Sequence, residues 1–232
     1  MIFGGNPGSA KTTVAKLFAG IAKEKGILKS GAFVERGGMD LDGLGCVTSI
    51  REAFVAAKGG VLFIDEAYSL CDAYENGYRD EAINTLVQEM GNHRDDVIVI
   101  FAGYTEPMKR FLERNPGMLS RIAFQVEFED YSTEELCEIT RLMVSQKEMT
   151  ITDEAINELR KYYDIISEAP DYGNGRFVRK TLEEAEMNLA ERLIKLKESE
   201  ITKELITTIE VCDIPNLSTR KRPGKRKLGF AC

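Results

Sequence analysis

The segment GNPGSAKT, residues 5–12, follows a short apolar run and precedes a helical pattern. Its glycines allow several backbone N–H groups to turn toward one point, and a helix that starts there adds the positive end of its dipole. Lys11 is placed to neutralise phosphate charge, and the hydroxyl of Thr12 is placed to bind Mg²⁺. The segment therefore predicts a phosphate-binding turn. Its candidate contact residues are Gly5, Asn6, Pro7, Gly8, Ser9, Ala10, Lys11, Thr12 and Thr13.

Ala10 departs from the usual pattern of such turns, in which glycine stands just before the lysine. A methyl group at this position crowds the backbone if the residue must adopt a positive φ. We therefore expect the contact between this turn and a phosphate to be weakened or altered, but not lost.

The sequence around the turn alternates short apolar runs with helical patterns. This alternation is typical of a parallel sheet covered by helices on both faces. The runs VLFI and VIVIFA read as strands that are buried on both sides. We expect strands at 1–3, 32–36, 61–64, 97–102 and 123–128, and helices at 11–25, 49–58 and 79–90.

Two carboxylates, Asp65 and Glu66, end the apolar run GGVLFIDEAYSL. Adjacent acids at the end of a buried strand are costly unless they serve an ion or a proton transfer. Ligands of open α/β sheets bind at this carboxyl edge. We assign Asp65 to Mg²⁺, through water, and Glu66 to the base that orients and activates an attacking water. A small-molecule kinase has no need for such a glutamate, and the NKxD element expected of a GTPase is not present.

The character of the sequence changes near residue 130, after which helical patterns recur. Ser132 and Glu135 form a capping box, and further helices are expected at 153–165 and 177–197. We divide the chain into an α/β domain at 1–130, a small helical domain at 131–213 and a basic tail at 214–232.

Composition excludes several classes of function. The formal net charge is −7, and six Lys and Arg residues lie within the tail stretch TRKRPGKRK, so the rest of the chain is more acidic still. An acidic body does not favour nucleic-acid binding. With His93 as the single histidine, histidine-based triads and metal centres are not expected. The five cysteines lack paired spacing and are read as reduced thiols of a cytoplasmic protein, and no apolar run is long enough to span a membrane.

With both motifs and the helical appendage, the chain resembles AAA+ ATPases. Within them it is similar to the CbbX (CfxQ) and stage V sporulation protein K branch. The resemblance covers residues 1–214 and implies a parallel sheet with a C-terminal helical lid, the use of ATP and Mg²⁺, and a ring that is usually a hexamer. Its motifs are GNPGSAKTTVAKL, GGVLFIDEAYSL, DEAINTLVQEM, VIVIFAGY, NPGMLSRI and GNGRFVRKTLEEA.

The resemblance also implies roles for residues outside the two motifs. The strand VIVIFAGY should end in a sensor of the γ-phosphate, held by Thr105 or Tyr104. Arg121, in NPGMLSRI, matches the arginine finger that reaches the ATP of a neighbouring subunit. Arg176, in GNGRFVR, matches the second sensor, which places positive charge near the γ-phosphate.

The sequence departs from the family at two further places. Family members have a segment before the first strand that covers the adenine, and here residues 1–3 come directly before the turn, so we expect a fragment or an incomplete adenine site. Members of the branch also carry an aromatic residue in a glycine-flanked loop that grips a substrate chain. The matching stretch, MDLDGLGCVTS, has Leu44 as its nearest bulky side chain. This departure argues against threading of a substrate chain.

Three functions follow from these observations. The first is an ATP-hydrolysing, ring-forming remodeller of an unidentified protein partner, with no membrane and no nucleic acid as partner. The second is a module that binds ATP and senses it with little hydrolysis, which the altered turn and loop favour. The third is a motor acting on DNA or RNA, suggested by the basic tail alone.

Overall fold

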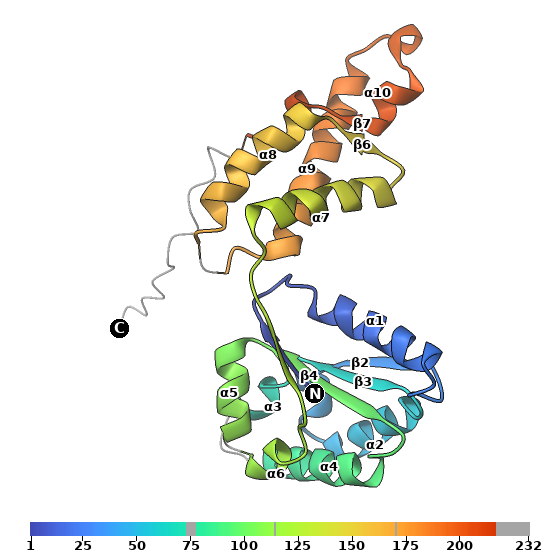
Figure 1. Ribbon diagram of the computed structural model, residues 1–232, viewed down its shortest axis with the longest axis vertical. Coiled ribbons are helices and arrows are strands. Elements are labelled where there is room, and N and C mark those ends of the chain that lie inside the picture. The colour runs from blue at the N-terminus through green and yellow to red at the C-terminus, as the bar shows by residue number, and fades with distance from the viewer. Residues whose placement is uncertain (73–77, 114, 170, 217–232) are drawn as a thin grey trace. The chain divides into compact units, whose positions relative to one another are not determined.

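The computed structural model describes residues 1–72, 78–113, 115–169 and 171–216, and it divides the chain into two compact units (Figure 1). The first, Met1–Asp130, is here called the core unit. The second, Tyr131–Cys232, is called the helical unit. Each unit has its own hydrophobic core and is described separately.

The core unit is an α/β structure. Its strands are β1 (Ile2–Gly5), β2 (Phe33–Gly37), β3 (Val61–Asp65), β4 (Ile98–Gly103) and β5 (Gln125–Phe128). Its helices are α1 (Lys11–Glu24), α2 (Cys46–Ala56), α3 (Ser69–Asp72), α4 (Tyr78–Asn92), α5 (Thr105–Glu113) and α6 (Pro116–Leu119), with the 3-10 turn η1 (Gly38–Leu41). The strands form one sheet in the order β2-β3-β4-β1-β5, and every pair is parallel. The predicted parallel α/β fold is confirmed.

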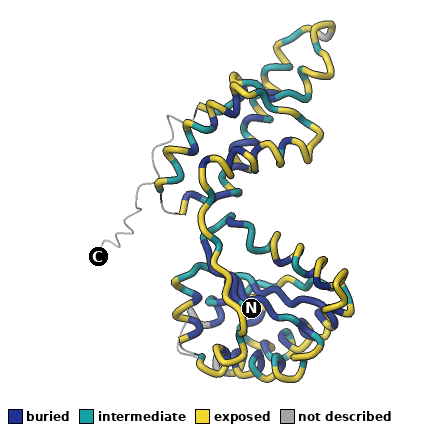
Figure 2. Tube along the Cα trace, in the orientation of Figure 1, coloured by how far each residue is buried: buried dark blue, intermediate teal, exposed yellow. Residues whose placement is uncertain are grey.

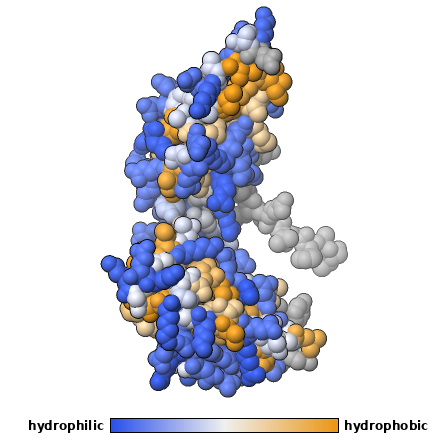
Figure 3. Space-filling model, turned by 90° about the vertical axis from the view of Figure 1, so that its right-hand side faces the viewer, coloured by the Kyte–Doolittle hydropathy of each residue, from blue (hydrophilic) through white to orange (hydrophobic). Residues whose placement is uncertain are grey.

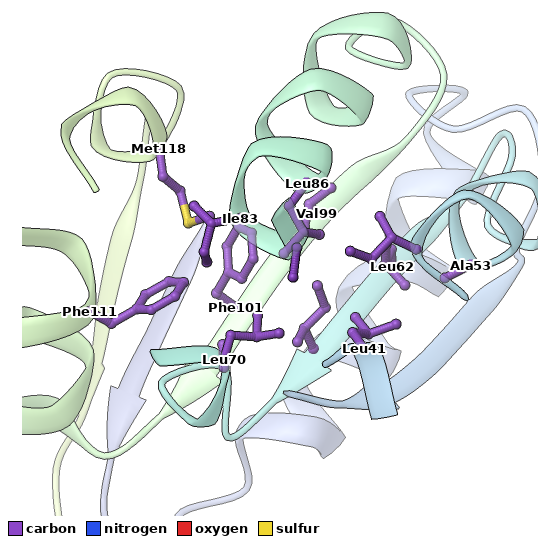
Figure 4. Packing of buried hydrophobic residues seen from close by; sticks show 14 of the residues in the cluster. Leu41, Ala53, Leu62, Leu70, Ile83, Leu86, Val99, Phe101, Phe111 and Met118 are labelled. Atoms are coloured by element: carbon purple, nitrogen blue, oxygen red, sulfur yellow. The ribbon is translucent and has the colours of Figure 1, made fainter. Parts of the chain in front are cut away.

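Helices cover both faces of this sheet, because successive strand residues point to opposite sides. On one face, Phe63 and Ile100 pack against a row of alanines in α1. On the other face, Leu62 and Phe101 pack against residues from α2, α4, α5 and α6 (Figure 4). Figure 2 shows the central strands buried, whereas β5 at the edge of the sheet is largely exposed.

The register of the strands brings the candidate site residues to one edge. Gly4 pairs with Gly103, and Gly5 pairs with Phe128. On the other side of β4, Gly37 pairs with Asp65. The carboxyl ends of all five strands therefore meet at one edge. Since β4 alone separates β1 from β3, the phosphate turn and Asp65 follow strands about 10 Å apart.

The amino group of Met1 lies at the opposite edge, where it donates a 2.7 Å hydrogen bond to the carbonyl of Val99. Burial lowers the pKa of this ammonium group from 8.0 to about 6. Between pH 6 and pH 8 the unfolded chain then binds more protons than the folded one, so stability must rise with pH across this window.

For a chain whose first residue is Met1, we expect the free energy of unfolding to increase by about 2 to 3 kcal/mol from below pH 6 to above pH 8. Urea unfolding at a series of pH values measures this. A chain carrying one glycine ahead of Met1 is the control, because it has an uncharged amide at this position. An identical pH dependence in both chains would contradict the burial of the amine.

The helical unit is built from three main helices and a short sheet. Its elements are α7 (Thr133–Gln146), β6 (Thr150–Ile151), α8 (Asp153–Ile166), α9 (Asn174–Ile194), η2 (Glu198–Glu200), α10 (Lys203–Thr207), β7 (Thr208–Ile209) and η3 (Val211–Asp213). The predicted capping box is present, since the Ser132 hydroxyl accepts from the Glu135 N–H and Glu135 accepts from the Ser132 N–H. A buried 2.8 Å hydrogen bond between Thr140 and Tyr163 joins α7 to α8.

One end of the helical unit carries apolar surface (Figure 3). The exposed apolar residues of this unit include Ile194, the last residue of α9, and Ile206 of α10. Near the end of α9, Arg192 forms an ion pair with Asp213, because it donates two 2.8 Å hydrogen bonds to the buried carboxylate of that residue. The ion pair fixes η3 against the end of α9.

The structure adds elements that the sequence did not predict. Helix α5 follows β4 directly, and the parallel pair β6-β7 joins residues 58 positions apart, such as Thr150 and Thr208. The basic residues of the predicted tail lie in 217–232, outside the described residues. Along the described part of the chain, we find no helix with the length and apolar character needed to cross a bilayer.

Candidate functional site

The phosphate turn, residues 5–12, connects β1 to α1 and is held by its own hydrogen bonds. The Lys11 ammonium donates 2.9 Å bonds to the carbonyls of Gly5 and Asn6. The Ser9 hydroxyl donates a 2.9 Å bond to the same Asn6 carbonyl. The positive charge of Lys11 therefore lies within the turn, at the N-terminus of α1, where helix dipole and ammonium both favour an anion. Thr12 follows in the first turn of this helix.

Ala10 adopts the left-handed conformation, with φ of 65°. Ala10 therefore has the positive φ at which the sequence analysis expected crowding by the methyl group. A residue with a Cβ is strained in this conformation, and glycine is not. The strain falls on the residue immediately before Lys11.

Replacing Ala10 by glycine should raise stability by up to about 1 kcal/mol, because the backbone strain is relieved. We also expect ATP to bind severalfold more tightly, since the turn can then close without distortion. Chemical unfolding and titration with a fluorescent ATP analogue measure the two effects. The matched control is Ala56→Gly at the exposed end of α2, which should lose stability. A loss of stability in Ala10→Gly would contradict the argument.

Asp65 and Glu66 lie at the carboxyl end of β3, as the sequence predicted. The Asp65 carboxylate accepts a 3.0 Å hydrogen bond from the Glu66 N–H, which fixes its orientation. Glu66 is exposed and also has a positive φ, of 48°. Among the described residues of the core unit, Ala10 and Glu66 are the two non-glycine residues with this conformation. Strained backbone gathers at functional sites, and here it marks both turns at the sheet edge.

Gly38, in η1, supports the turn that carries Glu66, and the sequence analysis did not identify it. A Cβ on Gly38 would lie 2.7 Å from the Glu66 carbonyl oxygen and 2.4 Å from the Ser69 hydroxyl. A side chain at position 38 would therefore displace the acidic turn. The glycine pair at the end of β2 was the available signal.

The two candidates for the first sensor lie in different surroundings. The Tyr104 ring packs on the Tyr68 ring, with centroids 5.8 Å apart. The Thr105 hydroxyl lies 3.4 Å from the position that a Cβ on Gly4 would take, so it lies beside the last residues of β1. Thr105 is thus next to the phosphate turn, whereas Tyr104 contacts the segment after Glu66.

Arg121 is not part of this edge cluster, and Arg176 belongs to the other unit. Arg121 is exposed, and its guanidinium donates a 2.7 Å bond to the Gly117 carbonyl. It precedes β5, whose first residue, Gln125, pairs with Ile2 at the start of β1. Arg121 therefore lies toward the edge opposite the phosphate turn of its own chain. Arg176 belongs to the helical unit, where it is exposed in the first turn of α9.

The donor set of the edge fits Mg²⁺ held together with phosphates. Mg²⁺ is usually bound by one or two carboxylates plus phosphate oxygens and water, rather than by a full cage of protein ligands. Within the described residues, no group of three or more His, Cys, Asp or Glu side chains forms such a cage. Asp65 and Thr12 are the residues that would take part.

Comparison with known families accounts for almost the whole chain. Residues 1–130 match the family described as ATPase family associated with various cellular activities (AAA), and residues 132–224 match the AAA lid domain. The chain therefore belongs to the AAA ATPase family.

Within this family, the chain is similar to CfxQ and CbbX proteins, as the motifs predicted. It is 40% identical to a CfxQ homolog of Pyropia yezoensis over 218 residues, which cover 92% of this chain and 73% of that protein. It is also 40% identical to CbbX of Cereibacter sphaeroides, covering 92% and 71%. A chloroplastic ribulose bisphosphate carboxylase/oxygenase activase of Cyanidioschyzon merolae is 39% identical, with coverage of 92% and 74%.

Solved structures share the fold at lower sequence identity. The FIGL-1 AAA domain in complex with ADP has a TM-score of 0.63 at 18% identity, covering 91% of this chain and 68% of that one. A RuvB mutant of Thermotoga maritima has a TM-score of 0.57 at 22% identity, covering 88% and 59%. These similarities support the arrangement of sheet and helices described above.

Proposed function

We propose that the chain binds ATP with Mg²⁺ at the carboxyl edge of the core sheet and hydrolyses it. The observation that carries this proposal is the convergence of two strained turns at one edge, one holding Lys11 and the other holding Asp65 and Glu66. Phosphoryl transfer to water requires a cation for the phosphates, two oxygen ligands for the metal and a carboxylate for the attacking water.

Each residue then has a distinct role. Lys11 neutralises the β- and γ-phosphates, and Thr12 and Asp65 bind Mg²⁺ directly or through water. Glu66 orients the attacking water and accepts its proton. Thr105 senses the γ-phosphate, because its hydroxyl lies beside Gly4 whereas Tyr104 is packed on Tyr68. Arg176 supplies charge from the helical unit.

We also propose that copies of the chain assemble into a ring and act on a protein partner. Arg121 is exposed and lies away from the phosphate turn of its own chain, which suits a residue that completes the site of a neighbour. Leu44, 91% exposed in the loop before α2, is the side chain in that loop best placed to contact a partner. One relative is named an activase of a carboxylase/oxygenase, so a protein substrate is the class we favour.

Mg²⁺-dependent ATP hydrolysis, measured over a range of protein concentrations, tests the proposal. Turnover per subunit should rise with concentration, because each site is completed by a second copy. Lys11→Ala should abolish turnover and ATP binding together. Lys16→Ala is the control, since Lys16 lies on the exposed side of the same helix and pairs with Glu35. Turnover that persists in Lys11→Ala would contradict the assignment of the site.

A second function is favoured by the strain at Ala10. If this strain weakens contact with the phosphates, the chain could bind ATP and report its presence without efficient hydrolysis. The same measurements separate the two functions. Tight ATP binding without turnover, even where the copies associate, would select the sensing module.

A further inference from the structure

The junction between the core unit and the helical unit is a single peptide, Asp130–Tyr131, and each of its two residues is held by hydrogen bonds within its own unit. On the core side, the Asn6 amide donates hydrogen bonds of 3.1 and 2.9 Å to the two carboxylate oxygens of Asp130. Asn6 belongs to the phosphate turn, and its carbonyl accepts the bonds from Lys11 and Ser9. The last residue of the core unit is thus bound to the turn that the proposed function assigns to ATP.

On the other side, Tyr131 is bound to the start of α9. Its N–H donates a 2.9 Å hydrogen bond to the Asn174 side-chain oxygen. The Tyr172 hydroxyl lies 2.8 Å from both the Tyr131 carbonyl and the same Asn174 oxygen. Asn174 is fully buried, with 0% of its surface exposed, and is the first residue of the helix that carries Arg176.

The backbone at Asn174 is shaped for this contact. Gly173 and Asn174 both have positive φ, of 97° and 47°. Asparagine tolerates this conformation better than most residues with a side chain. The buried Asn174 oxygen accepts the Tyr131 N–H and shares the single hydroxyl hydrogen of Tyr172 with the Tyr131 carbonyl, so it holds its position firmly. By contrast, the hydrogen bonds from Asn6 to Asp130 are exposed, so water competes for them and their net contribution is small.

We infer that Asp130 and Asn174 are positioning residues that pass the state of the phosphate turn to the helix bearing Arg176. The inference rests on the proposed binding of ATP at this turn. Phosphate oxygens that compete for Lys11 would move Asn6, and Asn6 holds Asp130. Because the next residue, Tyr131, is fixed to Asn174, a change at Asp130 reaches α9 through one peptide unit. The exposed hydrogen bonds from Asn6 to Asp130 are the ones that change, and the buried hydrogen bond from Tyr131 to Asn174 transmits the change.

Hydrogen exchange of the full chain, followed by mass spectrometry with and without Mg²⁺ and ATP, tests this inference. The segments to follow are the phosphate turn, the junction 129–133 and the first turns of α9. In the parent chain, ATP should slow exchange at least threefold in all three. In Asp130→Ala, the turn should remain protected by ATP, whereas the response of α9 should be lost.

Three further variants separate coupling from simple damage to the fold. Asn174→Asp keeps an oxygen acceptor for Tyr131 and Tyr172 and should retain the response, whereas Asn174→Ala should lose it. Glu129→Ala changes an exposed acidic neighbour and should behave as the parent does. Without nucleotide, Asn174→Ala should speed exchange at the junction about tenfold, and Asp130→Ala should speed exchange in the turn and the junction together.

The outcomes decide between the proposals. An α9 response to ATP in Asp130→Ala that equals the response in the parent would overturn the inference while leaving ATP binding intact. If ATP protects nothing in the parent, the proposed function fails. The measurements without nucleotide then test the hydrogen bonds at the junction by themselves. Unchanged exchange at the junction in both alanine variants would overturn the inference that these hydrogen bonds hold it.

Discussion

Replacing Glu66 by glutamine should lower ATP turnover at least 100-fold while ATP affinity stays within about threefold of the parent. The amide keeps the size of the side chain and the left-handed backbone at this position, but it cannot accept a proton from the attacking water. Steady-state hydrolysis and titration with a fluorescent ATP analogue give the two quantities. Binding is retained because Lys11 and the phosphate turn are unchanged.

The same substitution at an exposed position provides the control. Glu52→Gln, on the outer side of α2, should leave both turnover and affinity unchanged. Undiminished hydrolysis in Glu66→Gln would remove Glu66 from the mechanism. Loss of ATP binding in this variant would show that the carboxylate serves the nucleotide or its metal and not the water.

Replacing Arg121 by alanine should lower turnover by about 10³-fold, the lower end of the effect of arginine fingers in related phosphoryl-transfer enzymes. ATP binding should persist, because Arg121 lies away from the phosphate turn of its own chain. Arg94 is also exposed, so Arg94→Ala is the matched control and should leave turnover and ATP binding unchanged.

Mixing two inactive variants tests whether the arginine acts on a neighbour. Arg121→Ala keeps an intact phosphate turn but lacks the finger, whereas Lys11→Ala lacks the turn's charge but keeps the finger. A mixture should recover part of the parent activity, because Lys11→Ala copies supply Arg121 to the sites of Arg121→Ala copies. Failure of the mixture to recover activity, in copies that still associate, would rule out a finger acting between subunits.

The elements around the site could be predicted because local patterns determine them. VLFI and VIVIFA are apolar on both sides, so they had to be central strands, and Asp65 had to fall at the edge where they end. The phosphate turn was recognisable because its chemistry lies within eight consecutive residues.

Other features depend on contacts between distant residues and leave little local trace. Tyr131 and Asn174 lie 43 positions apart, and Asn6 and Asp130 lie 124 apart. The positive φ of Glu66 also has no signal in the sequence, because glutamate is an ordinary residue for a turn that precedes a helix. The turn also depends on a distant glycine, because a Cβ at Gly38 would lie 2.7 Å from the Glu66 carbonyl oxygen.

The left-handed backbone at Ala10 and at Glu66 has opposite consequences for the evolution of the protein. At position 10, glycine would relieve strain and improve the turn, so selection for thermal tolerance and selection for catalysis favour the same change. At position 66, glycine would relieve strain of about 1 kcal/mol and delete the carboxylate. A laboratory selection for heat resistance alone would therefore enrich two glycines, one that helps the enzyme and one that silences it.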